Sequence, residues 1–400
     1  MESKQVIVGV TGGIAAYKAA ELVRLLVKSE IRTRVAMTRH ATRFVTPLTF
    51  ETLCGNPVIH DMWEGEGAAM AHIDWGQEAD LIIIAPATAN FVAKMAHGIG
   101  DDFLSTMLLA ATARVMVCPS MNTHMYENRA VQANLALLRD RGIVVMDPGK
   151  GQLACRTEGP GRLPEPVEIL DRAAALLSPQ DLSGLTILVT AGPTVEPIDP
   201  VRFVSNRSSG KMGYALADAA RKRGAAVILV SGPTNLTPPT GVEHIGVKSA
   251  EDMRTAVLDR RKNCHIIIKA AAVADYRPRQ SRDQKIKKGP EGVSLELVKN
   301  PDILAELGAS RHDYPGVLVG FAAETEDLLE NATEKVRAKN LDMIVANDVT
   351  RTDAGFDSDT NKVKIITKDG AVEDVPLMPK GKVADLVLDR SKAILDKNFE

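Results

Sequence analysis

The 400-residue sequence has few of the features that mark secreted, membrane or nucleic-acid-binding proteins. Its four cysteines are widely spaced and form no CxxC pair, so neither a disulfide framework nor a zinc site is expected. No run of about eighteen apolar residues suggests a membrane span. The net charge of −2 provides no broad basic surface for nucleic acid or anionic lipid. The first residues show no basic region followed by an apolar region, which a secretory leader would have, so we expect a cytoplasmic protein.

What is present is an ordinary globular composition, with 45% hydrophobic and 25% charged residues. A chain of this length predicts two domains. Short β-rich runs alternate with helical stretches, as in QVIVGV at 5–10 followed by a helix over 15–28. This alternation predicts parallel sheets that are covered by helices on both faces. The pattern restarts at 185–192, where LTILVTAG resembles the strand and small-residue turn of QVIVGVTGG.

The predicted organisation is therefore α/β, with two Rossmann-like domains over residues 1–180 and 186–400 and a turn-rich linker at 178–185. A hairpin around 368–370 and a final helix over about 380–396 are expected near the end. In open parallel sheets, ligands bind beyond the carboxyl ends of the strands. The segments that follow the strands are therefore the candidate sites.

Small or polar residues follow predicted strands of the first domain in three segments, TGGIAAYK at 11–18, APATANFVAKMAHGIGDDFLST at 85–106 and PSMNTHMY at 119–126. Gly12 and Gly13 permit close approach of a ligand, and the next helix N-terminus favours phosphate. This motif alone is weak, because GxGxxG spacing is absent and a plain turn explains it equally well. Capping of a helix by Thr88 or Asn90 is the alternative for the second segment. Together, the three segments predict a cofactor cleft.

Two single residues are candidates for chemistry at this cleft. His72 is a possible acid or base, although a lone histidine is more often a surface or satisfied residue. Cys155 lies in the Gly- and Pro-rich stretch 151–165, which is long enough to form a mobile flap. A thiol there could donate a proton to a substrate, whereas spacing alone favours a structural cysteine.

Taken in order, the motifs of the first half resemble those of the flavin-dependent cysteine decarboxylases: GVTGGIAAYK, PLTF, HID, APATAN, PSMNTHMY and ACRTEGPGR. Proteins of that family bind FMN in a flavodoxin-like domain that forms trimers. Two motifs depart from the family pattern. Tyr126 stands where tryptophan is usual, and Arg156-Thr157 replace Gly-Asp in the flap motif, so the details of flap contacts stay open.

The resemblance implies roles for individual residues. Asn122, with Met125, would bind the substrate carboxylate or amide, and His72 would be the base beside the flavin. Cys155 would protonate and help to reduce the enethiol product. FMN would oxidise the substrate thiol to a thioaldehyde, an electron sink that permits loss of carbon dioxide. The expected cofactor contacts are Gly12, Gly13, Ala15, Thr38, Pro86, Thr88, Asn90, Ser105 and Thr106.

The richest stretch of the second half is TAGPTVEPIDPVRFVSNRSSGKMGYALA at 190–217. It leaves a predicted strand, passes Asp199, Arg202 and Asn206, and enters a helix at SSGKMG. The free N–H groups of that helix, with Lys211, suit a phosphate group. The stretch is not a Walker A loop, because GxxxxGK[ST] is absent.

Two further segments carry charge. Asp275, in KAAAVADYRP, ends another strand and could hold a metal or a ribose. Lys285, Lys287 and Lys288 lie in DQKIKKGPEG. A charge run is usually a solvated face. A cationic loop opposite an acidic strand end nevertheless suits a nucleoside triphosphate with Mg²⁺.

These motifs resemble the phosphopantothenate–cysteine ligases, and the two halves together resemble the fused bacterial enzymes of coenzyme A biosynthesis. The shared segments cover most of residues 186–350 and are DPVRFVSNRSSGKMG, AAVADYRP, KIKK, KNPDIL, GFAAET and KNLDMIVAND. In the bacterial fused type the activating nucleotide is CTP, a choice over ATP that rests on the resemblance alone. The implied CTP contacts are Lys269, Asp275, Lys285, Pro301, Asp302, Ile303, Leu304, Phe321, Lys335 and Lys339.

Carried over in the same way, Asn206 would act on an acyl-cytidylate intermediate, with Arg202 and Ala272 nearby. Lys285 would stabilise charge as pyrophosphate leaves, and Asp275 would hold Mg²⁺. The chemistry is sound, because a carboxylate must be activated before an amine attacks it and cations stabilise a transferring phosphoryl group.

The sequence thus predicts a bifunctional enzyme that uses CTP to join 4′-phosphopantothenate to L-cysteine and then decarboxylates the product to 4′-phosphopantetheine. The expected partners are these small molecules, without nucleic acid or membrane. Decarboxylase trimers and ligase dimers would build a homo-oligomer compatible with a dodecamer.

Three alternatives stay open. An NAD-dependent oxidoreductase would need the missing GxGxxG turn and its acidic partner. A non-catalytic flavoprotein that regulates a partner is disfavoured by the presence of His72, Asn122 and Cys155. A flavin prenyltransferase shares the first fold but leaves residues 190–350 unexplained.

Overall fold

The computed structural model describes residues 4–63, 68–152, 158–287, 294–312, 314, 316–324, 328–348 and 358–399. The chain forms two compact units, Met1–Ser178 and Pro179–Glu400. The boundary falls inside the predicted linker 178–185. Most of that segment packs on the second unit: Leu182 is fully buried in its core, and Asp181 forms an ion pair of 2.6 Å with Arg223.

The first unit contains a parallel five-stranded sheet with the order β2-β1-β3-β4-β5. Its strands are β1 (Gln5–Val10), β2 (Arg32–Met37), β3 (Leu81–Ala87), β4 (Arg114–Pro119) and β5 (Val144–Val145). Every residue of β1 and β3 is buried, as expected of parallel strands with both faces covered. The strand order is that of the flavodoxin-like fold, which confirms the expected fold of this half.

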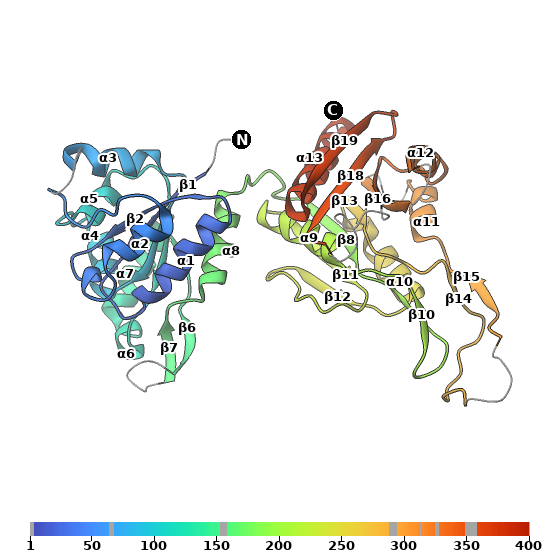
Figure 1. The fold of residues 1–400 in the computed structure, drawn as a ribbon, viewed down its shortest axis with the longest axis horizontal. Helices are drawn as coiled ribbons and strands as arrows, with labels where there is room; N and C mark the ends of the chain where they lie inside the picture. Colours follow the sequence, from blue (N-terminus) through green and yellow to red (C-terminus); the bar gives the residue numbers. More distant parts are fainter. Residues whose placement is uncertain are drawn as a thin grey trace. The chain divides into compact units, whose positions relative to one another are not determined.

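Helices cover both faces of this sheet (Figure 1). One face packs against α1, α2 and α8 through side chains such as Leu22 and Ile169. The other packs against α4, α5 and α7 through side chains such as Phe91 and Leu138. The helices are α1 (Ala16–Lys28), α2 (Pro47–Cys54), α3 (Ala68–Glu78), α4 (Ala89–His97), α5 (Phe103–Leu109), α6 (Thr123–Tyr126), α7 (Arg129–Asp140) and α8 (Pro166–Leu177), with the 3-10 turn η1 (Ala41–Arg43).

The second unit contains an eight-stranded sheet with the order β12-β11-β8-β13-β16-β17-β18-β19. The first six strands are parallel in the doubly wound Rossmann order. An antiparallel hairpin completes the sheet and turns near Gly370, as predicted. The strands are β8 (Thr186–Ala191), β11 (Ala226–Ser231), β12 (Glu243–Gly246), β13 (Ile266–Lys269), β16 (Val317–Glu324), β17 (Met343–Asp348), β18 (Thr360–Thr367) and β19 (Val372–Pro379).

Two cores flank this sheet as well. Helices α9 and α13 pack on one face through side chains such as Leu216 and Leu388, and α10, α11 and α12 pack on the other through Met253, Leu307 and Val336. The helices are α9 (Lys211–Lys222), α10 (Ala250–Arg260), α11 (Ile303–Ala309), α12 (Leu328–Ala338) and α13 (Lys380–Phe399), with the 3-10 turn η2 (Arg261–Asn263).

Three short antiparallel ribbons stand apart from the two sheets. They are β6 (Gly149–Gln152) with β7 (Glu158–Arg162), β9 (Val195–Pro197) with β10 (Phe203–Ser205), and β14 (Tyr276–Pro278) with β15 (Leu297–Lys299). The sequence pattern did not predict them, because strands of three to five residues are too short to show alternation. Within the described ranges, no helix is long and apolar enough to cross a membrane.

Candidate active sites

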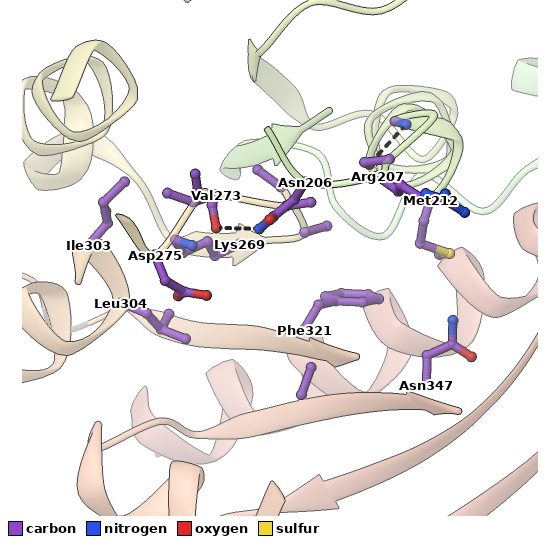
Figure 2. A pocket seen from close by; sticks show the side chains of 18 of the residues that line it. Asn206, Arg207, Met212, Lys269, Val273, Asp275, Ile303, Leu304, Phe321 and Asn347 are labelled. Atoms are coloured by element: carbon purple, nitrogen blue, oxygen red, sulfur yellow. Dashed lines mark hydrogen bonds between the residues drawn. The ribbon is translucent and has the colours of Figure 1, made fainter. Parts of the chain in front are cut away.

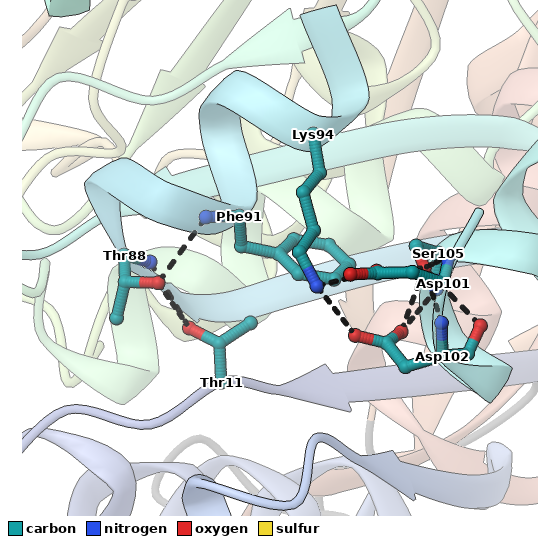
Figure 3. A network of polar contacts seen from close by, with 7 residues as sticks. All are labelled: Thr11, Thr88, Phe91, Lys94, Asp101, Asp102 and Ser105. Atoms are coloured by element: carbon teal, nitrogen blue, oxygen red, sulfur yellow. Dashed lines mark hydrogen bonds and ion pairs between the residues drawn. The ribbon is translucent and has the colours of Figure 1, made fainter. Parts of the chain in front are cut away.

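In the first unit, the turns after β1 and β3 meet where the strand order reverses. Thr11 Oγ1 donates to the carbonyl of Pro86 at 2.7 Å and accepts from the N–H of Thr88 at 3.0 Å. Thr88 Oγ1 caps α4 by accepting from the N–H of Phe91 (Figure 3). The capping alternative therefore holds for Thr88. The same residue also joins two predicted cofactor segments at the switch point, where open α/β sheets bind ligands.

The glycines of this turn have different surroundings. A Cβ on Gly12 would lie 2.4 Å from Cβ of His40, so glycine is required there by the approach of the turn after β2. A Cβ on Gly13 would meet only Cγ2 of Thr88, at 3.5 Å, which leaves its surroundings open. Thr38 extends the same edge, because its N–H donates to the carbonyl of Val10 at 3.0 Å. Of the other predicted contacts, Ala15 is half-buried, Pro86 buried and Asn90 exposed.

Ser105 and Thr106 lie in the first half of α5, where Ser105 is buried and Thr106 is half-buried. Ser105 completes a capping box with Asp102: its N–H donates to Asp102 Oδ1 at 2.8 Å, and its hydroxyl contacts the same carboxylate. Lys94 pairs with Asp101 and Asp102, as Figure 3 shows. The hydroxyl of Ser105 thus has protein partners. Thr106 Oγ1 is buried and has no hydrogen-bond partner in the described part of the chain.

The proposed decarboxylase residues come from separate elements. His72 lies on α3, and its buried Nδ1 has no hydrogen-bond partner among the described residues. Asn122 caps α6 by accepting from the N–H of His124 at 2.9 Å, and Met125 of that helix is half exposed. Cys155 lies outside the described residues.

A flavin fits this edge of the sheet on two grounds. The turns after β1 and β3 present small residues and backbone groups, beside the exposed side chains of Ile14 and Tyr17 that a planar ring could cover. Buried polar atoms normally have partners, and in the same unit the orphan atoms of His72 on α3 and Thr106 on α5 have unused hydrogen-bonding capacity.

The second unit holds a cavity of about 930 Å³. It lies beyond the carboxyl end of β13, beside β16, between the loop that enters α9 and the start of α11 (Figure 2). The neighbours β8 and β13 mark the switch point of this sheet. The predicted site residues that line the cavity are Asn206, Lys269, Ala272, Asp275, Pro301, Asp302, Ile303, Leu304, Phe321, Lys335 and Lys339.

Charged side chains line the cavity near the start of α11. Lys339 Nζ pairs with Asp302 at 2.7 Å, and Asp302 Oδ1 also caps α11 by accepting from two backbone N–H groups. Burial, aided by the nearby Lys339, lowers the pKa of Lys269 to about 8 against the opposing effect of Asp302 and Asp275. An anionic ligand would relieve this crowding of positive charge.

The entry to α9 and Phe321 also line the cavity. Asn206 Nδ2 donates to the carbonyl of Val273 at 2.9 Å, which ties the α9 entry loop to the segment after β13. A Cβ on Gly213 would lie 2.5 Å from Cβ of Ala191, so glycine lets α9 pack directly on β8.

The cavity also contains residues that sequence reasoning missed. Asn361 and Lys380, both buried, line it from β18 and from the start of α13. No motif marks them, because only the antiparallel hairpin brings this part of the chain to the site. Conversely, Arg202 and Lys285 are not among the lining residues and lie on the ribbon region beside the cavity.

Comparison with known proteins assigns a family. A Flavoprotein family model matches residues 1–178, and the DNA/pantothenate metabolism flavoprotein C-terminal domain matches residues 182–394. The coenzyme A biosynthesis bifunctional protein CoaBC of Bacillus subtilis (strain 168) is 47% identical over 405 residues, covering 100% of this chain and 99% of that protein. The chain belongs to the CoaBC family. This confirms the resemblance of both halves, including the flavoprotein character of the first.

Other CoaBC proteins agree. The Escherichia coli (strain K12) protein is 46% identical over 395 residues, with 97% of each chain covered. A crystal structure of the C-terminal domain of a CoaBC protein is 45% identical, covers 55% of this chain and 99% of that chain, and has a TM-score of 0.47.

Proposed function

We propose that this chain condenses 4′-phosphopantothenate with L-cysteine at the expense of CTP and then decarboxylates the product with the help of FMN. Membership of the CoaBC family makes it a bifunctional coenzyme A biosynthesis enzyme, with a decarboxylase and a ligase. Beyond family membership, we propose that the nucleotide is CTP, that the flavin is FMN, that condensation precedes decarboxylation, and that the residues named below carry out these steps. The observation that carries it is the cavity at the β8–β13 switch point, which is lined by Lys269, Lys335 and Lys339.

In the ligase unit, the substrate carboxylate attacks the α-phosphate of CTP, and pyrophosphate leaves. The cavity lysines neutralise the phosphates, and Lys285 stabilises the leaving charge. The cysteine amine then attacks the acyl-cytidylate carbonyl and CMP leaves, with Asn206 and Arg202 orienting the intermediate. Asp275 is the carboxylate that would hold Mg²⁺. The described residues form no group of three metal-ligating side chains, which suits an ion that is bound mainly through nucleotide phosphates.

In the decarboxylase unit, FMN supplies a two-electron oxidation of the substrate thiol and later returns the electrons. The turns after β1 and β3 would hold the cofactor through backbone groups and the hydroxyl of Thr88, with the hydroxyl of Thr106 contributed by α5. Asn122 binds the substrate carboxylate or amide, His72 takes the thiol proton, and Cys155 returns a proton to the product.

We further propose a cytoplasmic homo-oligomer. Large apolar side chains are exposed on both units, among them Leu48 and Leu109 on the first and Phe203 and Leu297 on the ribbons of the second. Exposed apolar side chains of this size are available for contacts between subunits. The cysteines Cys54, Cys118 and Cys264 are free thiols, which suits a reducing compartment.

A one-pot reaction analysed by mass spectrometry tests the function. Purified protein is mixed with 4′-phosphopantothenate, L-cysteine, Mg²⁺ and CTP, with ATP in a parallel tube. We expect 4′-phosphopantetheine with CTP and far less with ATP. Accumulation of 4′-phosphopantothenoylcysteine alone would remove the decarboxylase proposal. No condensed product with either nucleotide would overturn the ligase proposal.

A further inference from the structure

The two proposed catalytic cations that do not line the cavity, Arg202 and Lys285, are linked by one buried carboxylate. Asp199 stands at the tip of the β9–β10 ribbon, and its side chain has no exposed surface. Arg202 follows it at the same tip. Lys285 lies 86 positions after Asp199 in the chain. It is next to Ile286, which Asp199 contacts directly.

The two oxygens of Asp199 have separate partners. Oδ1 accepts from the backbone N–H groups of Val201 and Arg202, both at 2.8 Å, and so shapes the ribbon tip. Oδ2 accepts from the N–H of Ile286 at 3.1 Å and from Nη1 of Arg202 at 3.2 Å. One oxygen therefore fixes the turn, and the other holds the Lys285 segment.

Other bonds hold the same segment to the ribbon. Arg202 Nη1 donates to the carbonyl of Ile286 at 3.3 Å, so both backbone groups of Ile286 are engaged. The N–H of Arg282 donates to the carbonyl of Ile198 at 3.0 Å. In Figure 1 the β10 ribbon and the chain after β14 extend toward the same end of the unit, where these bonds join them.

We propose that Asp199 is a positioning residue, which holds Arg202 and the Lys285 segment as one unit and thereby sets the rate of pyrophosphate release. This inference rests on the proposed function of Lys285. A catalytic cation is effective only if it is in place before charge develops on the leaving group. A buried carboxylate that accepts four hydrogen bonds is a rigid anchor for that purpose.

The test substitution is Asp199→Asn, which preserves shape but leaves one acceptor oxygen. That oxygen can accept either from the N–H groups of the turn or from the N–H of Ile286. The amide NH₂ then faces the other set of donors, with which it cannot form hydrogen bonds. The assay is single-turnover pyrophosphate release from CTP and 4′-phosphopantothenate without cysteine. We expect a fall of at least about tenfold in rate with little change in the concentration of CTP needed for half-saturation.

A double-mutant cycle separates positioning from a general structural effect. In a Lys285→Ala background, Asp199→Asn should slow the reaction by less than about twofold, because its effect passes through Lys285. Asp181→Asn is the matched control, since it breaks the 2.6 Å ion pair with Arg223 elsewhere in the unit and should leave this half-reaction unchanged. Equal losses from Asp199→Asn in both backgrounds, or no loss in the wild-type background, would overturn the inference.

Amide hydrogen exchange keeps the inference testable apart from activity. Asp199→Asn should speed exchange at Ile286 and its neighbours, whereas Asp181→Asn should not. If Asp199→Asn fails to fold, Ile286→Pro removes the N–H that Asp199 accepts, leaves the bonds of Asp199 to the ribbon tip in place, and should reproduce the slow pyrophosphate release. Wild-type protein that releases no pyrophosphate would sink the proposed function. Unchanged amide exchange at Ile286 in Asp199→Asn would show that Asp199 does not hold the Lys285 segment.

Discussion

The two units place their candidate sites at the same kind of position and fill them with different chemistry. In the first unit, the β1–β3 switch point presents small residues and the hydroxyls of Thr11 and Thr88. In the second, the β8–β13 switch point opens on a cavity that Lys269, Lys335 and Lys339 line. One architecture thus supports two ligands, because strand order fixes where a ligand binds while the loops fix what is bound.

Under the proposed function, the difference in charge follows from what each ligand does. A cofactor that stays bound through the cycle needs close backbone approach and hydrogen bonds. A triphosphate that enters, reacts and leaves in two pieces needs cations that can exchange partners. Lys339, which is paired with Asp302 at 2.7 Å, is placed for such an exchange.

The largest expected effect comes from reciprocal asparagine substitutions. Asn206→Ala removes the amide that links the α9 entry loop to Val273, and we expect the condensation rate to fall by roughly a hundredfold or more. Decarboxylation of supplied 4′-phosphopantothenoylcysteine should be unchanged. Asn122→Ala should show the opposite pattern. Separate assays of the two half-reactions on each variant measure this.

Asn128→Ala is the matched control for Asn122→Ala. Both asparagines cap a helix by accepting a backbone N–H at 2.9 Å, so both substitutions lose a cap of about 1 kcal/mol. Only Asn122→Ala should abolish decarboxylation. If the two variants retained the same activity, Asn122 would be merely a capping residue.

Whether an element could be predicted from the sequence depended on the length of its hydrophobic pattern. The strands QVIVGV and LTILVTAG and the helices after them are long and patterned, so both sheets and the position of the sites were predictable. The ribbons β9–β10 and β14–β15 were not, because three-residue strands carry no periodicity.

Long-range contacts also limited how many residues of the site could be predicted from the sequence. Asn361 and Lys380 reach the cavity only through the β18–β19 hairpin, and the bond from Ile286 to Asp199 spans 87 positions. Motif reading identifies residues that are close in sequence to a known pattern. It does not identify residues that the fold brings to the site from elsewhere.

A smaller effect is expected on the pH dependence of CTP binding at the cavity of the second unit. The Lys269 pKa of about 8 lies below the ordinary value of 10.5, so the free site loses this charge as pH rises through 8. Bound phosphates favour the protonated form. CTP affinity should therefore fall roughly tenfold between pH 7 and pH 9, with uptake of nearly one proton on binding at pH 9.

Calorimetry in buffers of different ionisation enthalpy measures this proton uptake. Lys269→Met should weaken binding at pH 7 and abolish most of the uptake at pH 9. Flavin retention by the first unit should not change over this range, since Lys269 belongs to the second unit. Uptake that survived in Lys269→Met would assign the titration to another group.

The smallest expected effect concerns how the flavin site is built. Thr88→Val keeps the side-chain shape but removes the α4 cap and the hydroxyl that faces Thr11. Ser249→Ala is its counterpart in the second unit, where Ser249 caps α10. Each should lower the free energy of unfolding by about 1 kcal/mol, because each loses one cap. Only Thr88→Val should also weaken flavin retention, measured by absorbance after dialysis, because it removes the hydroxyl that contacts Thr11 between the two turns at the switch point. Equal flavin retention in the two variants would reduce Thr88 to a cap and move the cofactor contact to the backbone of the same turn.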